Sequence, residues 1–516
     1  MPYQPQLISI VHPDLVDHDS LARRVRELLH SHLPRYARLW NYYRNPMTTA
    51  LASGESGRPY QQGQEWGMPS RITGRSNNDA TTGLTRKEVV VENDIAWRID
   101  TMVDFLFGRS VQIESRANDP ARKRLIEETL QQIIQANGDS GFFQRLALLG
   151  SVYGFVDVMI KFENNIPSHH PDFTPVTSTH TTAPLEDLKC LAGCLRWEIV
   201  EPPRALAIVD ETDPTRVVAH AQVWRQRKVK PASRVQATPA RSLGLWQRLS
   251  GALPTDLPGQ VTDDSYVTVV ELVSPGQWQR YEDEVLVAAG KNTLERLPLI
   301  HIQNVALPFE YAGASDVEGL IPLQDELNTR LSDRAYRITM QSSKMYLGKG
   351  IADFASLPVS PGRMWSTDNL EAAVIEFGGD ASCPSEIAHI ADVREALDKQ
   401  SGVSPIAAGA IRGRIGRLTS AAALRVTFLS LLARTTRKHL TYGPAIAQAC
   451  ELSLAWLDHA GLFHTTPEER RVDIHWPSPI PEGDLLRLDE VSPEVAEERD
   501  QTPETSDSDP ARSGAD

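Results

Sequence analysis

The chain has 516 residues, of which 41% are hydrophobic and 23% are charged, and its formal net charge is -14 at pH 7. This length predicts several domains, and this composition excludes a chain that is disordered throughout. The acidic total argues against a protein that grips nucleic acid over a broad surface, and no apolar run approaches the roughly 18 residues of a membrane-spanning helix.

Helices are predicted in four stretches of the N-terminal region. Apolar residues recur there at three- and four-residue spacing, which places them on one face of a helix. The stretches are 16–45, 89–107, 122–135 and 142–153. The sequence between the first two is rich in glycine, serine, asparagine and glutamine and has no periodicity. Residues 47–85 are therefore predicted to be a long flexible loop.

The pattern changes to short β-strands after Gly154. The strand segments are rich in valine, isoleucine, tryptophan and tyrosine, and SPGQ at 274–277 has the composition of a hairpin turn. The predicted strands are 155–162, 194–200, 205–209, 217–227, 266–273 and 278–281. Insertions rich in proline, serine and threonine, at 164–184 and 231–264, are predicted to be loops. We therefore expect 1–314 to form an α+β domain decorated with loops.

A long helix is predicted to follow this domain. Ser315 and Glu318 have the spacing of a capping box, and apolar residues then recur at helical spacing to about Tyr346. At 1.5 Å per residue this helix would be roughly 45 Å long, which is long for a globular core. Residues 347–383 are predicted to form a compact unit with a strand at 372–377, and 384–401 a second helix.

The next segment, 402–418, is rich in glycine and carries three arginines just before another helix. Glycines permit backbone motion and arginines contact phosphate, so the segment is a candidate nucleic-acid contact. A surface loop whose arginines keep it soluble is the alternative, and the local sequence alone favours it. The candidate residues are Arg412, Gly413, Arg414, Gly416 and Arg417.

The C-terminal part is predicted to be a very long helix followed by a strand and a tail. The helix covers 419–458 and is expected to bend at Gly443 and Pro444, because proline lacks the amide hydrogen of a regular helix. A short strand is predicted at 472–476. The tail, 481–516, contains twelve Asp or Glu against three Arg and is predicted to be largely disordered.

No catalytic or metal-binding signature stands out in the sequence. It lacks GxxxxGK[ST], HExxH, GxSxG and a GxGxxG that follows a strand, so we expect no enzymatic activity, no cofactor and no metal. Cys190 and Cys194 have no second Cys or His pair at zinc-finger spacing and are interpreted as reduced thiols. The histidines within 164–184 are interpreted as part of a solvated loop.

Three segments, taken in order with the parts between them, carry a family resemblance. They are NDIAWRIDTMVDFLFGRSVQIES at 93–115, GSVYGFVDVMIKF at 150–162, and the segment from PFEYAGASDVEGL to KMYLGKG at 308–350. A small insert, a second helix, a glycine-rich loop, a long kinked helix, a strand and an acidic tail follow. In this order the chain resembles the portal proteins of tailed double-stranded DNA bacteriophages of the siphophage type, over about 85–485.

The resemblance implies a ring of about twelve copies at one vertex of a capsid, through which DNA is packaged and ejected. The parts would be a wing at 1–314, stem helices at 315–346 and 384–401, a clip at 347–383, a tunnel loop at 402–418, and a kinked wing helix with the crown base at 419–480. Asp325 and Arg334 would lie on the stem at seams between copies. The tunnel-loop arginines would face the passing duplex.

The resemblance also implies partners and a location. The partners would be other copies of the chain, double-stranded DNA that passes without sequence recognition, the terminase large subunit, a head-completion or adaptor protein, and the major capsid and scaffolding proteins. The chain would be assembled in the host cytoplasm, as its lack of signal-peptide features suggests, and would end in the virion. The alternative is a structural adaptor without a channel, which would form only a small assembly.

Overall fold

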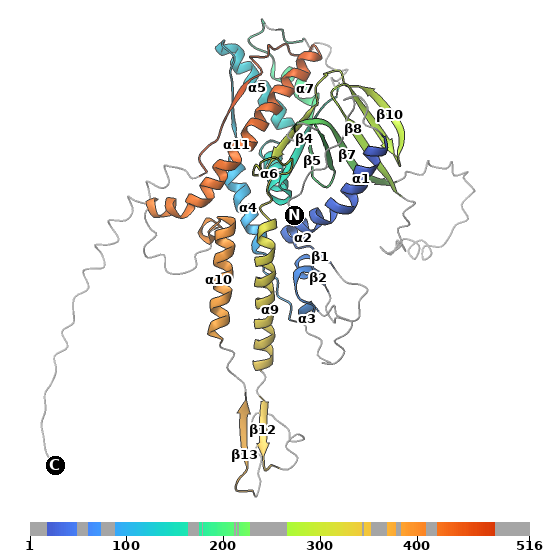
Figure 1. The fold of residues 1–516 in the computed structure, drawn as a ribbon. Helices are drawn as coiled ribbons and strands as arrows, with labels where there is room; N and C mark the ends of the chain where they lie inside the picture. Colours follow the sequence, from blue (N-terminus) through green and yellow to red (C-terminus); the bar gives the residue numbers. More distant parts are fainter. Residues whose placement is uncertain are drawn as a thin grey trace, which may run out of the picture.

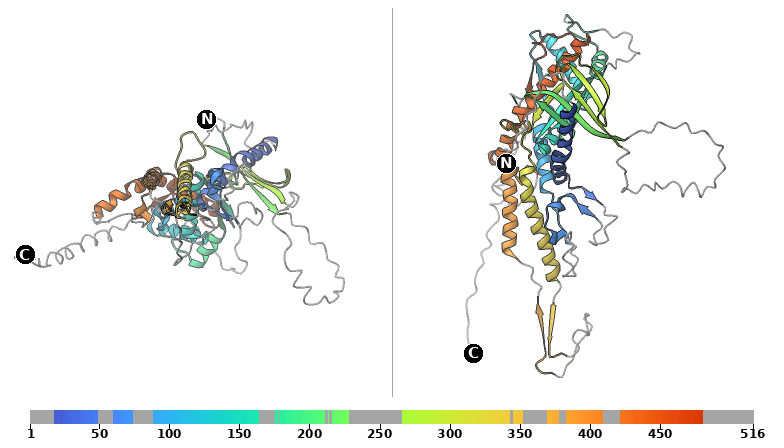
Figure 2. Two further views of the ribbon diagram at one scale, coloured as in Figure 1. Left: turned by 90° about the horizontal axis from the view of Figure 1, so that it is seen from below. Right: turned by 45° about the vertical axis from the view of Figure 1, so that its right-hand side comes forward.

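The computed structural model describes residues 18–48, 60–73, 88–163, 175–177, 179–210, 213, 216–227, 266–342, 345–351, 369–377, 383–408 and 421–479. It has an α+β body, from which α9 (Ile321–Ser342) and α10 (Pro384–Ser401) project side by side (Figure 1). The right-hand view of Figure 2 shows the same elongated shape, and the left-hand view shows the molecule from below. The predicted loop 231–264, residues 164–174 of the predicted loop 164–184, residues 409–418 of the predicted tunnel loop, and the tail lie outside the described residues.

Two helices joined by a π turn begin the body. α1 (His18–Glu27) continues through the turn Leu28–His32 into α2 (Leu33–Arg44), which confirms the predicted helix over its described residues. The side chains of Leu28, Tyr36, Leu39 and Tyr42 are buried. α2 ends before Asn45, whose φ of 42° is a left-handed conformation that asparagine tolerates at a helix end.

Four further helices of nine or more residues precede α9 in the described part of the body. They are α4 (Asp94–Phe107), α5 (Pro120–Ala136), α6 (Asp139–Tyr153) and α7 (Leu185–Gly193), of which only α7 was not predicted. The Asn93 side chain caps α4 by accepting a hydrogen bond from the amide of Ala96 at 3.4 Å. Gly154 ends α6 with a φ of 97°, and a Cβ there would collide with the carbonyl of Gly313. The turn from α6 into the next strand therefore requires glycine.

Two antiparallel sheets form the β part of the body. The three-stranded sheet has the order β11-β4-β5, and the five-stranded sheet has the order β10-β9-β8-β7-β6. The strands are β4 (Phe155–Phe162), β5 (Leu195–Val200), β6 (Ala205–Val209), β7 (Val217–Arg227), β8 (Tyr266–Val273), β9 (Gln277–Glu282), β10 (Val285–Lys291) and β11 (Leu299–Gln303). The predicted hairpin at 274–277 is confirmed, because Val273 pairs with Trp278. β10 and β11 were not predicted as strands.

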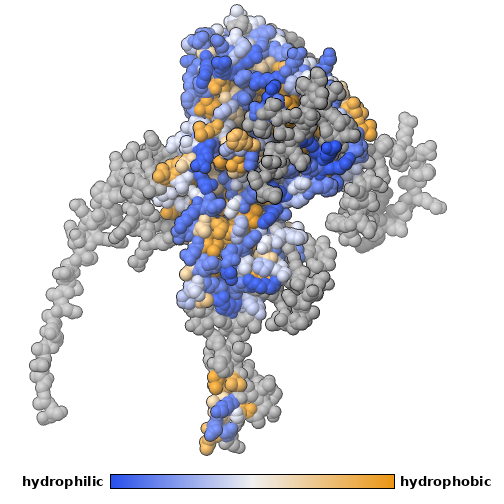
Figure 3. Space-filling view, in the orientation of Figure 1, coloured by the Kyte–Doolittle hydropathy of each residue, from blue (hydrophilic) through white to orange (hydrophobic). Residues whose placement is uncertain are grey.

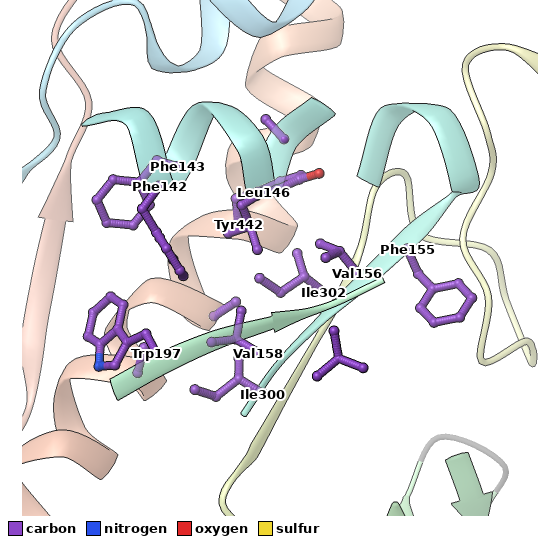
Figure 4. Close-up of a cluster of buried hydrophobic side chains, with 14 of the residues drawn as sticks. Phe142, Phe143, Leu146, Phe155, Val156, Val158, Trp197, Ile300, Ile302 and Tyr442 are labelled. Atoms are coloured by element: carbon purple, nitrogen blue, oxygen red, sulfur yellow. The ribbon is translucent and has the colours of Figure 1, made fainter. Parts of the chain in front are cut away.

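The core of the body lies between α6, the three-stranded sheet and the long C-terminal helix (Figure 4). The buried side chains there include Phe142, Phe143, Leu146, Val156, Val158, Ile300, Ile302 and Tyr442. The first six residues of β4 are all buried, which explains why this strand reads as nearly continuous apolar sequence. Asp157 is the exception in that run, and its carboxylate is described below.

The C-terminal helix packs against elements from the first part of the chain, including α4 and β4. α11 (Ala421–His459) confirms the predicted long helix and runs through Pro444, and its first part points in a different direction from the rest (Figure 1). β14 (Val472–His475) confirms the predicted strand and pairs antiparallel with β3 (Gln112–Ser115), directly after α4. The body therefore contains residues from both halves of the sequence.

The prediction that the first stem helix continues to about Tyr346 is wrong. A 3-10 turn at Glu318–Leu320 leads into α9, which ends at Ser342, so its 22 residues span about 33 Å. Met345–Lys349 form strand β12, which pairs antiparallel with β13 (Ala373–Phe377). Strand pairing outweighs the helical pattern of this segment, because a segment with a partner strand gains ladder hydrogen bonds that the end of a helix lacks.

The prediction of a flexible loop over 47–85 is wrong for 60–73. This stretch contains β2 (Gln61–Gln62), which pairs with β1 (Met47–Thr48), a 3-10 turn at Gly63–Gly67, and the short helix α3 (Ser70–Thr73). Gln64 is buried and donates to the carbonyl of Tyr42 and to Asn93 Oδ1, each at 2.7 Å. The polar composition of 60–73 is typical of a loop, but the polar groups of this segment form hydrogen bonds inside the fold.

Gly67 allows this segment to approach α9 closely. A Cβ at this position would collide with the carboxylate of Asp325 and with the hydroxyl of Tyr42. Gly67→Ala is therefore expected to lower the free energy of unfolding by about 1–3 kcal/mol through overpacking, which urea denaturation would measure. Gly141→Ala is the matched control, because nothing lies within 4 Å of a Cβ there. The free energy of unfolding of the Gly141→Ala variant should rise slightly, because Gly141 is exposed in α6 and alanine favours a helix more than glycine does. Equal losses of stability in both variants would contradict the packing argument.

Candidate functional site: the stalk and its junction with the body

The stalk, defined here as α9, β12, β13 and α10, is held together along its length by cross-helix pairs. The Arg337 guanidinium donates to both carboxylate oxygens of Glu386, each at 2.8 Å. Nearer the body, His389 Nε2 lies 2.9 Å from Glu326 Oε1. Apolar side chains are buried along the same pair, namely Leu327, Leu331, Ile390, Val393 and Leu397. These contacts fix the register between α9 and α10.

The outer end of the stalk is a two-stranded ribbon with exposed apolar side chains. Leu347 on β12 is 51% exposed, and Val374 and Ile375 on β13 are each 42% exposed. Figure 3 shows this apolar surface at the tip of the molecule. An isolated pair of strands is at best marginally stable in water, and its two edges are open to further pairing. The ribbon therefore has the properties of a binding surface.

A buried arginine joins the body to the inner end of α10. Arg98 of α4 is 0% exposed and lies 3.2 Å from Asp94 Oδ2. On the stalk side its Nη1 lies at ion-pair distance, 2.7 Å, from Asp398 Oδ1, without the alignment of a hydrogen bond. The same nitrogen donates to Ser401 Oγ at 3.1 Å and to the carbonyl of Val403 at 3.0 Å. Arg98 therefore holds both the last turn of α10 and the first residues of the segment predicted to be the tunnel loop.

α11 holds the same junction from its other side. Gly402 ends α10 with a φ of 68°, and its carbonyl accepts a hydrogen bond from Ser430 Oγ at 2.8 Å. Arg434 donates to the carbonyl of Gln400 at 2.5 Å. The described residues that follow α10, up to residue 408, therefore start from a position fixed by α4 and α11 together.

A second buried charge network anchors the inner end of α9. Asp316 and Lys438 are both almost fully buried, and Lys438 Nζ lies 2.7 Å from Asp316 Oδ2. Lys438 also donates to Ser151 Oγ at 2.7 Å, and Asn304 Nδ2 donates to Asp316 Oδ2 at 2.7 Å. The buried pair is thus surrounded by hydrogen-bonding partners, as such a pair requires. It connects the segment that precedes α9 to α11.

The predicted capping box at the start of α9 is only half formed. Ser315 Oγ accepts hydrogen bonds from the amides of Val317 at 3.1 Å and Glu318 at 3.3 Å, as a cap should. The Glu318 carboxylate instead accepts from Arg35 of α2, at 3.1 and 2.7 Å. Because the arginine offers two aligned donors, its hydrogen bonds lower the pKa of Glu318 more than burial raises it. Glu318 therefore links α9 to α2 rather than closing its own helix end.

Asp325 and Arg334 differ in their surroundings on α9. Asp325 Oδ1 accepts from the Tyr42 hydroxyl at 2.5 Å, so this carboxylate is engaged within its own chain. Burial raises the pKa of Asp325 above its usual range, although the hydrogen bond from Tyr42 opposes that shift. Arg334 is half-buried on the same helix. A position at a seam between copies stays a prediction for both.

The other predicted site residues divide between described and undescribed parts of the chain. Gly443 and Pro444 lie inside α11, and a Cβ at Gly443 would approach the ring of Trp476 at no less than 3.6 Å. The tunnel-loop candidates Arg412, Gly413, Arg414, Gly416 and Arg417 lie outside the described residues.

Asp157 of β4 centres a buried polar cluster beneath residues 304–314. Its carboxylate accepts from His220 Nε2 at 3.0 Å, His301 Nδ1 at 2.7 Å and the Tyr311 hydroxyl at 3.0 Å. His301 Nε2 also lies 2.8 Å from the carbonyl oxygen of Tyr311, so the imidazole connects the buried carboxylate to the backbone of the loop. Burial would raise the pKa of Asp157, but the charge of His301 and the histidine hydrogen bonds outweigh it and lower that pKa.

The described part of the chain contains neither a cluster of metal ligands nor a helix suited to span a membrane. No three His, Cys, Asp or Glu side chains converge there as metal ligands. Neither Cys190 nor Cys194 is in a disulfide, and Cys194 Sγ donates to the carbonyl of Cys190 at 3.4 Å. None of the helices in the described ranges is both long enough and apolar enough to cross a bilayer.

Sequence reasoning missed the two buried charge networks. Arg98 lies three residues after Ile95 and one before Ile99, so it falls on the apolar face of its helix. Lys438 occupies a comparable position in α11. The sequence does contain a sign of such networks, namely a charged residue on a helix face that otherwise carries apolar residues. A charge on such a face is buried, and burial of a charge is tolerated only when the charge is paired. The partner of each could not be read from the local sequence.

Comparisons with known proteins found similarity at the level of structure only. No protein-family model and no curated protein matches the sequence. The chain is similar to a chain of the virion of a native gene transfer agent particle, with 12% identity, a TM-score of 0.36, and coverage of 78% of this chain and 82% of that one. It is also similar to a chain of the neck of an empty gene transfer agent particle, with 13% identity, a TM-score of 0.36, and coverage of 78% and 83%.

Proposed function

We propose that the chain is the portal protein of a tailed double-stranded DNA bacteriophage, a ring subunit through which the genome enters and leaves the capsid. The observation that carries this proposal is the stalk, whose helix pair projects from the body and keeps apolar side chains exposed near its outer end. Ile338 on α9 is 48% exposed and Ile387 on α10 is 56% exposed. Side-by-side packing of many copies around one axis would cover such side chains, and a closed ring needs contacts of this heterologous kind.

The two buried charge networks support this proposal because they make the stalk a rigid extension of the body. Asp316 and Lys438 hold the inner end of α9, and Arg98 and Asp398 hold the inner end of α10. A hinged pair of helices could not keep a channel of constant width. A pair fixed at both inner ends can do so, because each copy then presents the same stalk angle to its neighbours.

The same junction supports the proposed role of the tunnel loop. Residues 402–408 leave α10 where Arg98 and α11 fix the chain, so the segment that follows starts from the inner end of the stalk. We propose that Arg412, Arg414 and Arg417 contact passing phosphates briefly, without reading bases. A conduit needs weak contact, and the net charge of -14 is consistent with a lining that does not hold DNA in place.

The ribbon at the outer end of the stalk is proposed as the docking surface for other virion proteins. Its exposed Leu347, Val374 and Ile375 would be covered by the terminase large subunit during packaging and by a head-completion or adaptor protein afterwards. The chain itself is proposed to have no enzymatic activity and no cofactor, and to reside at a capsid vertex in the virion with the major capsid and scaffolding proteins as neighbours.

Electron microscopy and native mass spectrometry of the purified full chain test the proposal. The expected result is a closed ring of about twelve copies with a central hole wide enough for a DNA duplex. A monomer, a dimer or an open chain of copies at micromolar concentration would contradict the channel and would favour the alternative, a structural adaptor without a bore.

The tunnel-loop arginines have their own test in phage that carry the altered gene. Replacing Arg412, Arg414 and Arg417 by alanine is expected to leave rings intact and to change the amount of DNA packaged or retained, because phosphate contacts are lost while the helices stay packed. Replacing the same three by lysine is the matched control, which keeps the charge and should behave much more like the wild type. Normal packaging and retention in the alanine phage would mean that these arginines only keep the loop soluble.

A further inference from the structure

A groove lies between α1 and the strands β8 and β9 of the five-stranded sheet (Figure 1). Its volume is about 270 Å³. A cavity of about 150 Å³ holds benzene in another protein, so this groove has room for more than one apolar side chain. Most of its lining is apolar, with Leu21, Val25 and Leu29 on one wall and Val270 and Tyr281 on the other.

The apolar surface continues from the groove onto β10, the edge strand of the same sheet. Val285, Leu286 and Val287 directly follow Glu284 of the groove lining, and each of the three is at least 50% exposed. Among the described strands only β9 pairs with β10, so the other edge of β10 keeps unpaired backbone groups. Proteins usually cover or charge such an edge, because it otherwise pairs with another chain. The groove and this edge together are therefore a surface that we expect to be covered.

The rim of the groove is net acidic. Asp283 and Glu284 border it, and Arg26 is the one basic residue in its described lining. The two acidic residues form the β9–β10 turn with left-handed φ values of 46° and 69°, where asparagine and glycine are the usual residues. The Asp283 amide donates to the Thr268 carbonyl and the Thr268 amide donates to Asp283 Oδ1, each at 2.9 Å. The turn is therefore fixed beside the groove, and its carboxylates favour a basic occupant.

The insertion between β7 and β8 begins and ends beside this groove. Residues 228–265 lie outside the described residues, and the two residues that flank them, Arg227 and Tyr266, are directly paired across the two strands. Thr268, which lines the groove, follows Tyr266 by two positions. Because both of its ends are tethered there, the insertion is present at the groove at a high effective concentration.

The insertion contains one stretch, residues 241–253, with the chemistry that this groove would bind. From 228 to 253 the sequence has five Lys or Arg and no Asp or Glu, although the whole chain is acidic. The linkers on either side of the stretch have at least 12 residues each and would span roughly 40 Å when extended, so the stretch can reach the groove. Apolar residues recur in it at three- and four-residue spacing, which favours a single apolar face, namely Leu243, Trp246, Leu249 and Leu253.

We propose that residues 241–253 dock in the groove between α1 and strands β8 and β9 of the same copy, with their apolar face inward and Arg241 and Arg248 toward the acidic rim. The apolar side chains would replace water in the groove. The docked stretch would also keep the neighbouring edge of β10 from pairing with another copy. The contact lies within one copy, so it does not depend on the proposed ring, and the ring does not depend on it.

Limited trypsin digestion of the full chain tests the docking, because Arg248 lies inside the stretch and Arg234 lies in the linker before it. Cleavage after Arg248 should be at least about tenfold slower than cleavage after Arg234, since a docked segment must detach before it is cut. Trp246→Ser combined with Leu249→Ser should abolish this difference and leave the rate at Arg234 unchanged. Leu257→Ser is the matched control, because Leu257 belongs to the same insertion but lies outside the stretch, and it should leave both rates unchanged.

A charge exchange tests whether this groove is the receptor, with hydrogen exchange of the amides in 241–253 as the measurement. Glu284→Arg makes the rim net basic, and Arg241→Glu with Arg248→Glu makes the stretch acidic, so each change should speed the exchange. All three substitutions together should restore slow exchange, because rim and stretch are again opposite in charge. Glu295→Arg is the matched control, since Glu295 is also exposed with a left-handed φ of 52° but does not line the groove.

Three results would overturn the inference. Cleavage after Arg248 as fast as after Arg234 in the wild type would show that the stretch is not docked. Charge changes that speed the exchange without rescue in the combined variant would show that the groove is not its receptor. Protection of 241–253 that grows with protein concentration would show docking onto another copy in place of the contact within one copy.

Discussion

Arg98→Leu is expected to lower the free energy of unfolding by about 3–5 kcal/mol, because it leaves the buried Asp94 without its positive partner. It also removes the donors to Ser401 Oγ and to the carbonyl of Val403. Urea denaturation followed by far-UV circular dichroism would measure the loss. We further expect faster hydrogen exchange at 398–408 than in the wild type, because these residues lose their contact with α4.

Two variants serve as controls for the Arg98 prediction. Arg116→Leu breaks an ion pair with Asp473 that is largely exposed, and it should change the midpoint of unfolding little. Arg98→Leu combined with Asp94→Leu should recover part of the lost stability, because no uncompensated charge is then left at that position. If Arg98→Leu were no more harmful than Arg116→Leu, the buried network would not be what joins α10 to the body.

Asp316→Ala is expected to have an effect of similar size, about 3–5 kcal/mol, because the ammonium of Lys438 would stay buried without a counter-charge. The variant also frees Asn304 Nδ2 from one of its acceptors. The free energy of unfolding would again be measured in urea. If the purified variant folds, ring formation should also weaken, because α9 would no longer be held at a fixed angle to α11.

A double-mutant cycle separates the pair from the rest of this network. Lys438→Met removes the buried charge, so Asp316→Ala and Lys438→Met together should be less harmful than Asp316→Ala alone. Asp316→Asn is the conservative variant, since its side chain keeps an oxygen that can accept from Lys438 and Asn304. Strict additivity of Asp316→Ala and Lys438→Met would contradict a direct interaction between the two side chains.

Both predictions concern the orientation of α9 and α10 relative to the body, and not whether the two helices form. α9 and α10 have their own buried apolar face and cross-helix pairs such as Arg337 with Glu386, so each helix should persist when its inner anchor is removed. What the anchors add is a fixed relation to α4 and α11. In a ring of identical copies a small change of that angle is repeated at every seam, so assembly should respond more steeply than the stability of one chain.

The sequence by itself determined where most elements of the body lie. β4, β6, β7 and β8 have the predicted bounds, and α10 begins and ends as predicted, with Gly402 at its C-terminus. These features are local, because the alternation of side chains, the turn residues and the helix-ending glycine all act within a few residues. The α+β character of the wing follows from the same patterns.

The conformation of segments whose partners lie far along the chain depends on tertiary contacts. Residues 60–73 look like a loop until Gln64 is seen to bond to the carbonyl of Tyr42 and to Asn93, and Met345–Lys349 become a strand because β13 lies beside them. A sequence pattern records the polarity of such a segment but not the groups that satisfy it.

The same reason explains why the junction of stalk and body could not be predicted. Arg98 and Val403 are 305 positions apart, and Asp316 and Lys438 are separated by 122. The sequence marks a charge on a buried helix face, but many acidic residues could have been its partner. Folding selects one of them, because burying a charge is tolerated only beside a counter-charge with its remaining hydrogen bonds made.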